Sequence, residues 1–233
     1  MKITVADLDD LALGAVFLAT GGGGDPYVPR LIAEQVLQQF GGVEIIAPDA
    51  LADDAFVVSI GNVGAPTVGL ELLPSTDEAP NTLAVFENHV GRKVDAVVSF
   101  EIGGGNSLIP LLAAAARGIP VVDGDGMGRA LPEAQMMTYA IAGVHPTPAV
   151  AYDYAGNIAT FASTQNTLVY ERHIRSLSMA AGGMIITAEH PMSGAQLKDA
   201  IISGTLSFSC ALGKTLRANR GIANDLLAPL QKL

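Results

Sequence analysis

Short apolar segments alternate with helix-length segments through the first 145 residues, and this alternation constrains the fold more than any other feature. The expected strands lie at 43–47, 55–61, 95–103 and 120–125. Helical periodicity or capping signals mark 4–20, 26–40, 81–92, 107–118 and 131–143. Strands that alternate with helices of this length predict an α/β fold, in which a mostly parallel sheet carries helices on both faces.

The pattern changes near residue 145. Residues 147–163 predict a hairpin that turns at 155–157, and a helix at 167–181 and a strand at 184–189 follow. Three helical pieces complete the chain. We therefore expect an α/β glycine-loop domain over 1–145. Residues 146–233 are expected to form a smaller α+β portion, a hairpin plus helices, that leads to a further C-terminal domain.

The composition excludes several classes of protein. Of the 233 residues, 49% are apolar and the mean hydropathy is +0.38, which provides a core and excludes wholesale disorder. The net charge of −10 argues against nucleic acid and against an anionic membrane surface, because both select clustered Lys and Arg. The chain shows no apolar run of membrane-spanning length, no basic start of a signal peptide and a single cysteine. We expect a cytoplasmic protein.

Four consecutive glycines at 21–24 join the first two expected helices. Each glycine costs a helix about 1 kcal/mol relative to alanine, so the run is a poor scaffold unless the backbone must approach something closely. Asp25 and Pro26 have the character of a helix N-cap and first helical residue, and a helix start favours polar or anionic ligands. The run is either a tight connection or a ligand-binding loop. The binding prediction covers Gly22, Gly23 and Gly24.

Polar, glycine-rich loops also follow three of the expected strands. Ligands of open parallel sheets sit beyond the carboxyl ends of the strands, so we expect these loops to converge with the first glycine run. Candidate ligand-binding residues in them are Asn62, Gly104, Gly105, Asn106 and Arg129. Candidate catalytic carboxylates are Glu101, Asp123 and Asp125.

Each candidate also has a structural interpretation. Glu101 lies in an apolar strand, where a charge is expensive, and this favours a site residue over a satisfied structural acid. Asp123 and Asp125 face the same side if the strand continues that far, but both also suit a turn. Arg129 either clamps a substrate carboxylate or pairs with Asp125. Cys210 lies among apolar residues, which predicts core packing rather than a nucleophile.

The common cofactor motifs fail. Neither glycine run carries the lysine of a phosphate-binding loop or the third glycine of a dinucleotide fingerprint. "DGDGMG" begins like a calcium loop, but Met127 and Ala134 stand where ligands are required. The cofactor therefore stays unknown. A divalent metal remains an option: the oxygen-rich set favours a hard ion, and His145 or His190 would supply nitrogen for zinc.

Three segments in this order carry a family resemblance: "LATGGGGDPY", "FEIGGGNSLIPLLAAAARGIPVVDGDGMGRALPEAQM" and "RSLSMAAGG…PMSG…GTLSFSCALGKTLR". Together they resemble the S-methyl thiohydantoin desulfurase-like family over nearly the whole chain. Members look related to, and occur alongside, hydantoinase and oxoprolinase proteins, and commonly carry a second, β-rich domain. The resemblance implies an enzyme that replaces the sulfur substituent of a thiohydantoin ring by oxygen, in catabolism.

Chemically, such a hydrolysis needs an activated water, stabilisation of charge on the ring and a proton for the leaving thiol. On our chemical interpretation, Asp123 or Asp125 is the general base, and Glu101 is the acid if burial keeps it protonated. N–H groups of 22–24 or 103–105 would line the polar edge of the ring. Asn106 and Arg129 would orient the substrate.

Two other functions stay open at this point. The chain is alternatively a non-catalytic subunit of a hydantoinase-type complex, or a partner that binds a nucleotide through its glycine loops. In each case we expect a small-molecule ligand, together with a homo-oligomer or a hydantoinase-like partner.

Overall fold

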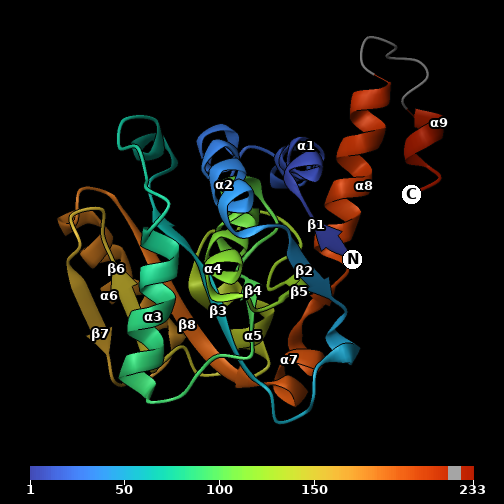
Figure 1. Ribbon diagram of the computed structural model, residues 1–233. Coiled ribbons are helices and arrows are strands. Elements are labelled where there is room, and N and C mark those ends of the chain that lie inside the picture. The colour runs from blue at the N-terminus through green and yellow to red at the C-terminus, as the bar shows by residue number, and fades with distance from the viewer. Residues whose placement is uncertain (220–226) are drawn as a thin grey trace.

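The computed structural model describes residues 1–219 and 227–233, and in them nine strands form one sheet (Figure 1). The strands are β1 (Lys2–Ile3), β2 (Val43–Ile46), β3 (Phe56–Gly64), β4 (Ala96–Ser99), β5 (Val121–Asp125), β6 (Ala149–Tyr152), β7 (Ile158–Phe161), β8 (Met184–Ser193) and β9 (Ile202–Ser203). The helices are α1 (Leu8–Ala19), α2 (Tyr27–Phe40), α3 (Glu78–Val90), α4 (Ile109–Arg117), α5 (Thr138–Ile141), α6 (Thr167–Ala180), α7 (Gly194–Ala200), α8 (Thr205–Ala218) and α9 (Leu227–Leu230). The predicted α/β class is confirmed. The part of the expected C-terminal helices that falls on 220–226 lies outside the described residues.

The sheet has a parallel centre with antiparallel additions. Its strand order is β1-β2-β5-β4-β3-β8-β6-β7, and β9 pairs with β5. Strands β2, β5, β4 and β3 are parallel, as the alternation predicts, whereas β1, β8, β9 and the β6–β7 hairpin pair antiparallel. The hairpin is confirmed, and β8 connects it to β3. The division of the chain near residue 145 stays a prediction.

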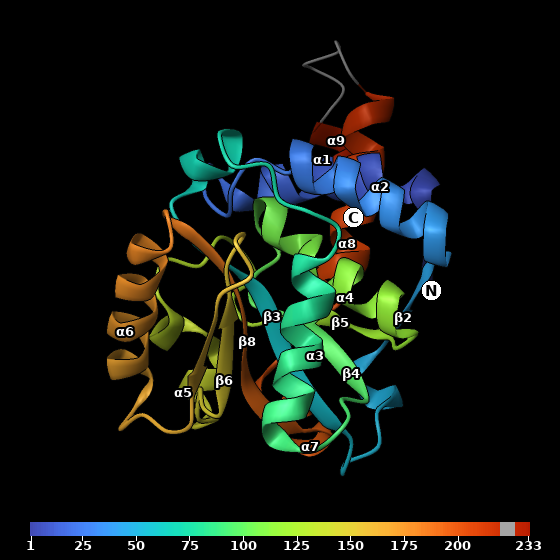
Figure 2. The same cartoon turned by 60° about the vertical axis from the view of Figure 1, so that its left-hand side comes forward.

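Two apolar clusters explain why the central strands read as continuous hydrophobic runs. All four residues of β4 are buried, because each face of the sheet packs against helices. On one face α1, α2, α3, α4 and α8 bury side chains, and on the other α5, α6 and α7 do so. Figure 2 shows α3 and α4 on one side of the sheet and α5 and α6 on the other. Cys210 packs against the first cluster, and burial raises the pKa of its thiol to about 12.

Two sequence-based boundaries are wrong. The helix expected at 131–143 is two short pieces, a 3-10 turn (Ala134–Met136) and α5. Glu133 and Met137 have extended backbone, with ψ of 142° at both, and this interrupts the helical segment on either side of the 3-10 turn. The strand expected at 95–103 ends at Ser99, because the N–H of Ile102 donates to Asp125 Oδ2 at 2.9 Å.

Candidate functional site

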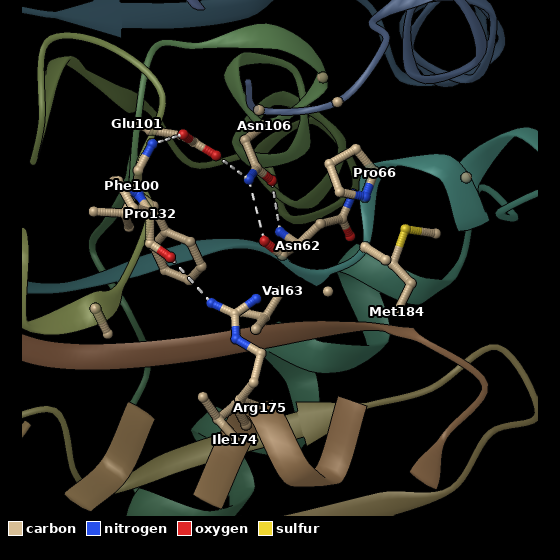
Figure 3. A pocket seen from close by; sticks show the side chains of 18 of the residues that line it. Asn62, Val63, Pro66, Phe100, Glu101, Asn106, Pro132, Ile174, Arg175 and Met184 are labelled. Atoms are coloured by element: carbon tan, nitrogen blue, oxygen red, sulfur yellow. Dashed lines mark hydrogen bonds between the residues drawn. The ribbon is translucent and has the colours of Figure 1, made fainter. Parts of the chain in front are cut away.

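A cavity lies at the carboxyl ends of β3 and β4, where loops of an open parallel sheet are expected to hold a ligand (Figure 3). Its volume is about 140 Å³. An engineered cavity of about 150 Å³ holds one benzene molecule, so this space suits one small ring. The wall consists of the loop at 23–25 and the first turn of α2, the end of β3 and the loop after it, the loops after β4 and β5, one face of α6 and part of β8.

The two glycine runs pack directly on each other at one wall of this cavity. A Cβ atom on Gly23 would overlap the carbonyl group of Gly103, and one on Gly104 would overlap the carbonyl of Gly24. Both glycines have positive φ, 70° and 59°, and Gly105 N–H donates to Gly24 O at 3.1 Å. Backbone against backbone therefore explains the absence of side chains at Gly23. Its predicted contact with a ligand stays a prediction.

Glu101 is held inside the cavity by two amide donors. Asn106 Nδ2 donates to Oε1 of Glu101 at 2.6 Å, and the N–H of Leu131 donates to Oε2. Asn106 is itself fixed by Asn62, whose N–H donates to Oδ1 at 2.6 Å and whose carbonyl accepts from Nδ2 at 3.1 Å. Asn62, Glu101 and Asn106 are labelled in Figure 3. Both ends of the Asn106 side-chain amide are bonded within the protein, which fixes the donor that Glu101 receives.

Burial gives Glu101 an unusual charge state. The residue is only 3% exposed, and burial raises the pKa of its carboxyl to about 7 against the opposing hydrogen bonds of Asn106 and Leu131. The nearby charge of Asp125 raises this pKa further, whereas Arg129 lowers it. A carboxyl with a pKa near neutrality both gives and takes protons at physiological pH, which is the property of a general acid–base group.

Asp125 and Asp123 lie outside the lining of the cavity. Asp125 Oδ2 accepts hydrogen bonds from the N–H groups of Ile102, Met127 and Gly128 at 2.7–3.0 Å, and burial raises the pKa of this carboxyl. It thereby fixes the loop that carries Glu101. Asp123 Oδ1 accepts from the N–H of Ser207 at 3.0 Å, in the first turn of α8.

The cation of the cavity comes from α6, which the sequence did not single out. Arg175 donates from Nε to Glu171 Oε1 at 2.9 Å and from an Nη to the carbonyl of Pro132 at 3.2 Å. Figure 3 shows it on the wall opposite Glu101 and Asn106. Glu171 and Arg175 are four residues apart, and this spacing puts both side chains on one face of a helix. Arg129, the predicted cation, is exposed, does not line the cavity and donates to the carbonyl of Ala130.

The structure thus brings together about half of the predicted site. The residues that line the cavity are Gly23, Gly24, Asn62, Glu101, Gly105 and Asn106. Those outside its lining are Gly22, Gly104, Asp123, Asp125 and Arg129. Reasoning from the sequence missed Arg175, Glu171 and Glu189. Glu189 carried the same signal as Glu101, a charge that closes an apolar run.

In the part of the chain that the structure describes, no three His, Cys, Asp or Glu side chains are grouped so that they could hold a metal ion. His145 is exposed and contacts the hydroxyl of Thr147 at 2.9 Å. His190 is fully buried in β8. A metal at this protein therefore stays a prediction.

None of the described helices combines the length and apolar character needed to cross a bilayer.

No curated protein matches the chain. A crystal structure of a protein from Chromobacterium violaceum matches with a TM-score of 0.80 and 30% identity over 94% of this chain. The match spans 62% of the length of that protein. Residues 6–163 match the S-Me-THD-like N-terminal domain, and residues 164–233 match the S-Me-THD-like C-terminal domain. The chain therefore belongs to the S-methyl thiohydantoin desulfurase-like family.

Proposed function

We propose that this protein hydrolyses a small thiohydantoin-like ring, with S-methyl thiohydantoin as the model substrate. Water adds to the ring carbon that carries the sulfur, the C–S bond breaks, and the products are hydantoin and methanethiol. The observation that carries this proposal is Glu101, a buried carboxyl with a pKa raised to about 7 that faces a cavity sized for one ring. The family name agrees with this chemistry.

Glu101 acts as the general acid in this proposal. Protonated Glu101 gives its proton to the ring nitrogen as water attacks. This proton neutralises the negative charge that develops on the nitrogen when the C=N bond opens. Its orientation is set by Asn106 and the N–H of Leu131, which hold the carboxyl in one rotamer before the substrate arrives. Asp125 accepts a hydrogen bond from the N–H of Ile102, the residue after Glu101, and so fixes the backbone that carries Glu101.

The remaining contacts of the ring come from the two walls. In residues 1–219 and 227–233 the N–H groups of Gly23 and Gly24 have no protein acceptor, so they are donors for the polar edge of a heterocycle. Arg175 on the opposite wall would receive a carboxylate tail on the ring, because its fork is partly exposed to the cavity.

The acidic lining disfavours the nucleotide alternative. Among the residues that the structure describes, the lining holds one guanidinium, of Arg175, against the carboxyl groups of Asp25, Glu101, Glu133, Glu171 and Glu189. A triphosphate carries several negative charges, which this surface repels. A neutral ring with N–H donors meets carboxylate acceptors instead.

The direct test is release of methanethiol from S-methyl thiohydantoin by the purified chain in 18O-labelled water. We expect one label in each hydantoin and a thiol in equal amount. Glu101→Gln should lower kcat by about 100-fold or more, because proton transfer contributes about 10²–10⁴-fold. Glu44→Gln, at an exposed carboxyl on β2 outside the cavity lining, is the matched control and should change little. Binding of the ring without any thiol release would instead favour a non-catalytic subunit.

A further inference from the structure

A second buried carboxylate closes the deep end of the same cavity. Glu189 in β8 is 1% exposed and lines the cavity from the sheet side, beneath α6. Two hydroxyl groups donate to its Oε2: Tyr170 at 2.5 Å and Thr187 at 2.9 Å. Since both partners donate to a single oxygen, Oε1 has capacity left for a ligand or a water molecule.

The backbone beside Glu189 is irregular in a way that is costly. Ser59 of β3 pairs with Glu189, but Val57 pairs with Met192, so β8 carries one extra residue at a β-bulge. Within the bulge His190 has a φ of +50°, a conformation that non-glycine residues adopt rarely. Bulges and such strain gather beside active sites, where they aim a side chain.

His190 adds a second unexplained feature to this bulge. Its ring is fully buried, and neither ring nitrogen has a hydrogen-bond partner within the described chain. Nδ1 lies 3.3 Å from Oε1 of Glu189, close enough to contact the carboxylate but without hydrogen-bond geometry. Oε2 of Glu189 is thus held by two hydroxyl groups, and Oε1 faces the buried His190 ring.

We propose that Glu189 is the second reacting carboxylate of the cavity, and that Tyr170, Thr187 and His190 are its positioning residues. This inference rests on the proposed hydrolysis. That reaction needs a general base beside the acid Glu101, and the two aspartates predicted for this role, Asp123 and Asp125, lie outside the cavity lining.

The proton transfers balance when the two carboxyl groups act in turn. Glu189 takes a proton from the attacking water, the water oxygen bonds to the ring carbon, and the ring nitrogen takes the proton of Glu101. In the second step the new hydroxyl group gives its proton to Glu101 while the C=O bond forms and the C–S bond breaks, and the proton on Glu189 goes to the departing sulfur. Both carboxyl groups return to their starting states, and no oxidant or reductant is consumed.

The test compares Glu189→Gln with wild type and with Glu44→Gln, an exposed carboxyl on β2 outside the cavity lining, using S-methyl thiohydantoin and the full chain. We expect kcat to fall by about 100-fold or more with KM nearly unchanged, because the step lost is a proton transfer. Glu189→Ala should be equally inactive and should regain part of kcat when formate is added, since formate replaces the missing carboxylate. Thermal unfolding of each variant checks that the fold is intact.

Tyr170→Phe keeps the inference testable even where Glu189 variants do not fold. It removes one donor to Glu189 without entering the cavity lining, and we expect kcat to fall about 10-fold with KM unchanged. If the wild type releases methanethiol and Glu189→Gln or Tyr170→Phe keeps the wild-type kcat, the role of Glu189 is overturned and the proposed function still stands. A wild type that binds the ring but releases no thiol would remove the proposed function and this inference with it.

Discussion

The two walls of the cavity are built on different principles. The glycine wall is backbone packed on backbone, at Gly23 against Gly103 and Gly104 against Gly24, and it leaves no room for side chains. The opposite wall is made of side chains from α6 and β8, among them Arg175 and Glu189, held by hydrogen bonds between segments far apart in the chain. The glycine wall thus fixes the shape of the cavity next to Glu101, whereas the opposite wall adds a cation and a second carboxylate.

The largest effect expected from this contrast is on stability at the glycine wall. Gly23→Ala combines a positive φ with an overlap against Gly103, which together should cost about 2–4 kcal/mol of unfolding free energy. Gly24→Ala is the matched control, because its φ is +79° but no atom lies within 4 Å of the added Cβ. It should cost about 1 kcal/mol. Equal losses in urea denaturation would break the comparison.

Glu101 lies on the wall opposite Arg175, and its burial should be visible as pH-dependent stability. Its pKa is raised from 4.5 to about 7, so the unfolded chain ionises first as the pH rises. Stability from this group is therefore complete below pH 4.5 and is lost as the pH rises through about 7, to a total of about 3 kcal/mol. The difference in unfolding free energy between wild type and Glu101→Gln isolates this contribution from other buried carboxyls. If the difference does not change between acidic and alkaline pH, Glu101 is not perturbed.

The two aspartates of "DGD" should separate in stability. Asp125→Ala leaves three backbone N–H groups beside Glu101 without their acceptor, which should cost about 2–3 kcal/mol. Asp123→Ala removes one acceptor at the start of α8 and should cost about 1 kcal/mol. Chemical denaturation of the two variants measures both values. Loss of catalysis in Asp123→Ala at unchanged stability would instead assign that aspartate a direct role.

The smallest effect should come from the side-chain wall. Arg175 is 40% exposed in its side chain, and a partly exposed ion pair with Glu171 contributes little, so Arg175→Ala should cost about 1 kcal/mol or less. Arg172→Ala, on the exposed face of the same helix, is the control and should be near neutral. Thermal unfolding gives both values. Arg175→Ala should weaken the binding of rings that carry a carboxylate and leave the binding of hydantoin, the neutral reference, unchanged. Calorimetry measures both affinities, and a weaker binding of hydantoin as well would contradict this role of Arg175.

The sequence predicted the parallel core because strand and helix periodicity are local signals, and it predicted Glu101 because a charge in an apolar run is unusual. It predicted that the glycine-rich loops converge, but not that the backbone of one glycine run packs directly on the backbone of the other. Arg175, which donates to Pro132 from a different part of the chain, escaped notice. The helix expected at 131–143 is interrupted by extended backbone at Glu133 and Met137, in a segment whose N–H groups donate to the distant Glu101 and Glu171, and only the fold brings these residues together.

The most direct measurement of the central claim is the titration of the Glu101 carboxyl, followed by its 13C chemical shift and assigned by comparison with Glu101→Gln. We predict a midpoint near 7, which would show a carboxyl that exchanges protons at physiological pH inside the cavity. A midpoint near the ordinary value of 4.5 would show a carboxylate ionised throughout, and the account of Glu101 as the acid of this site would be wrong.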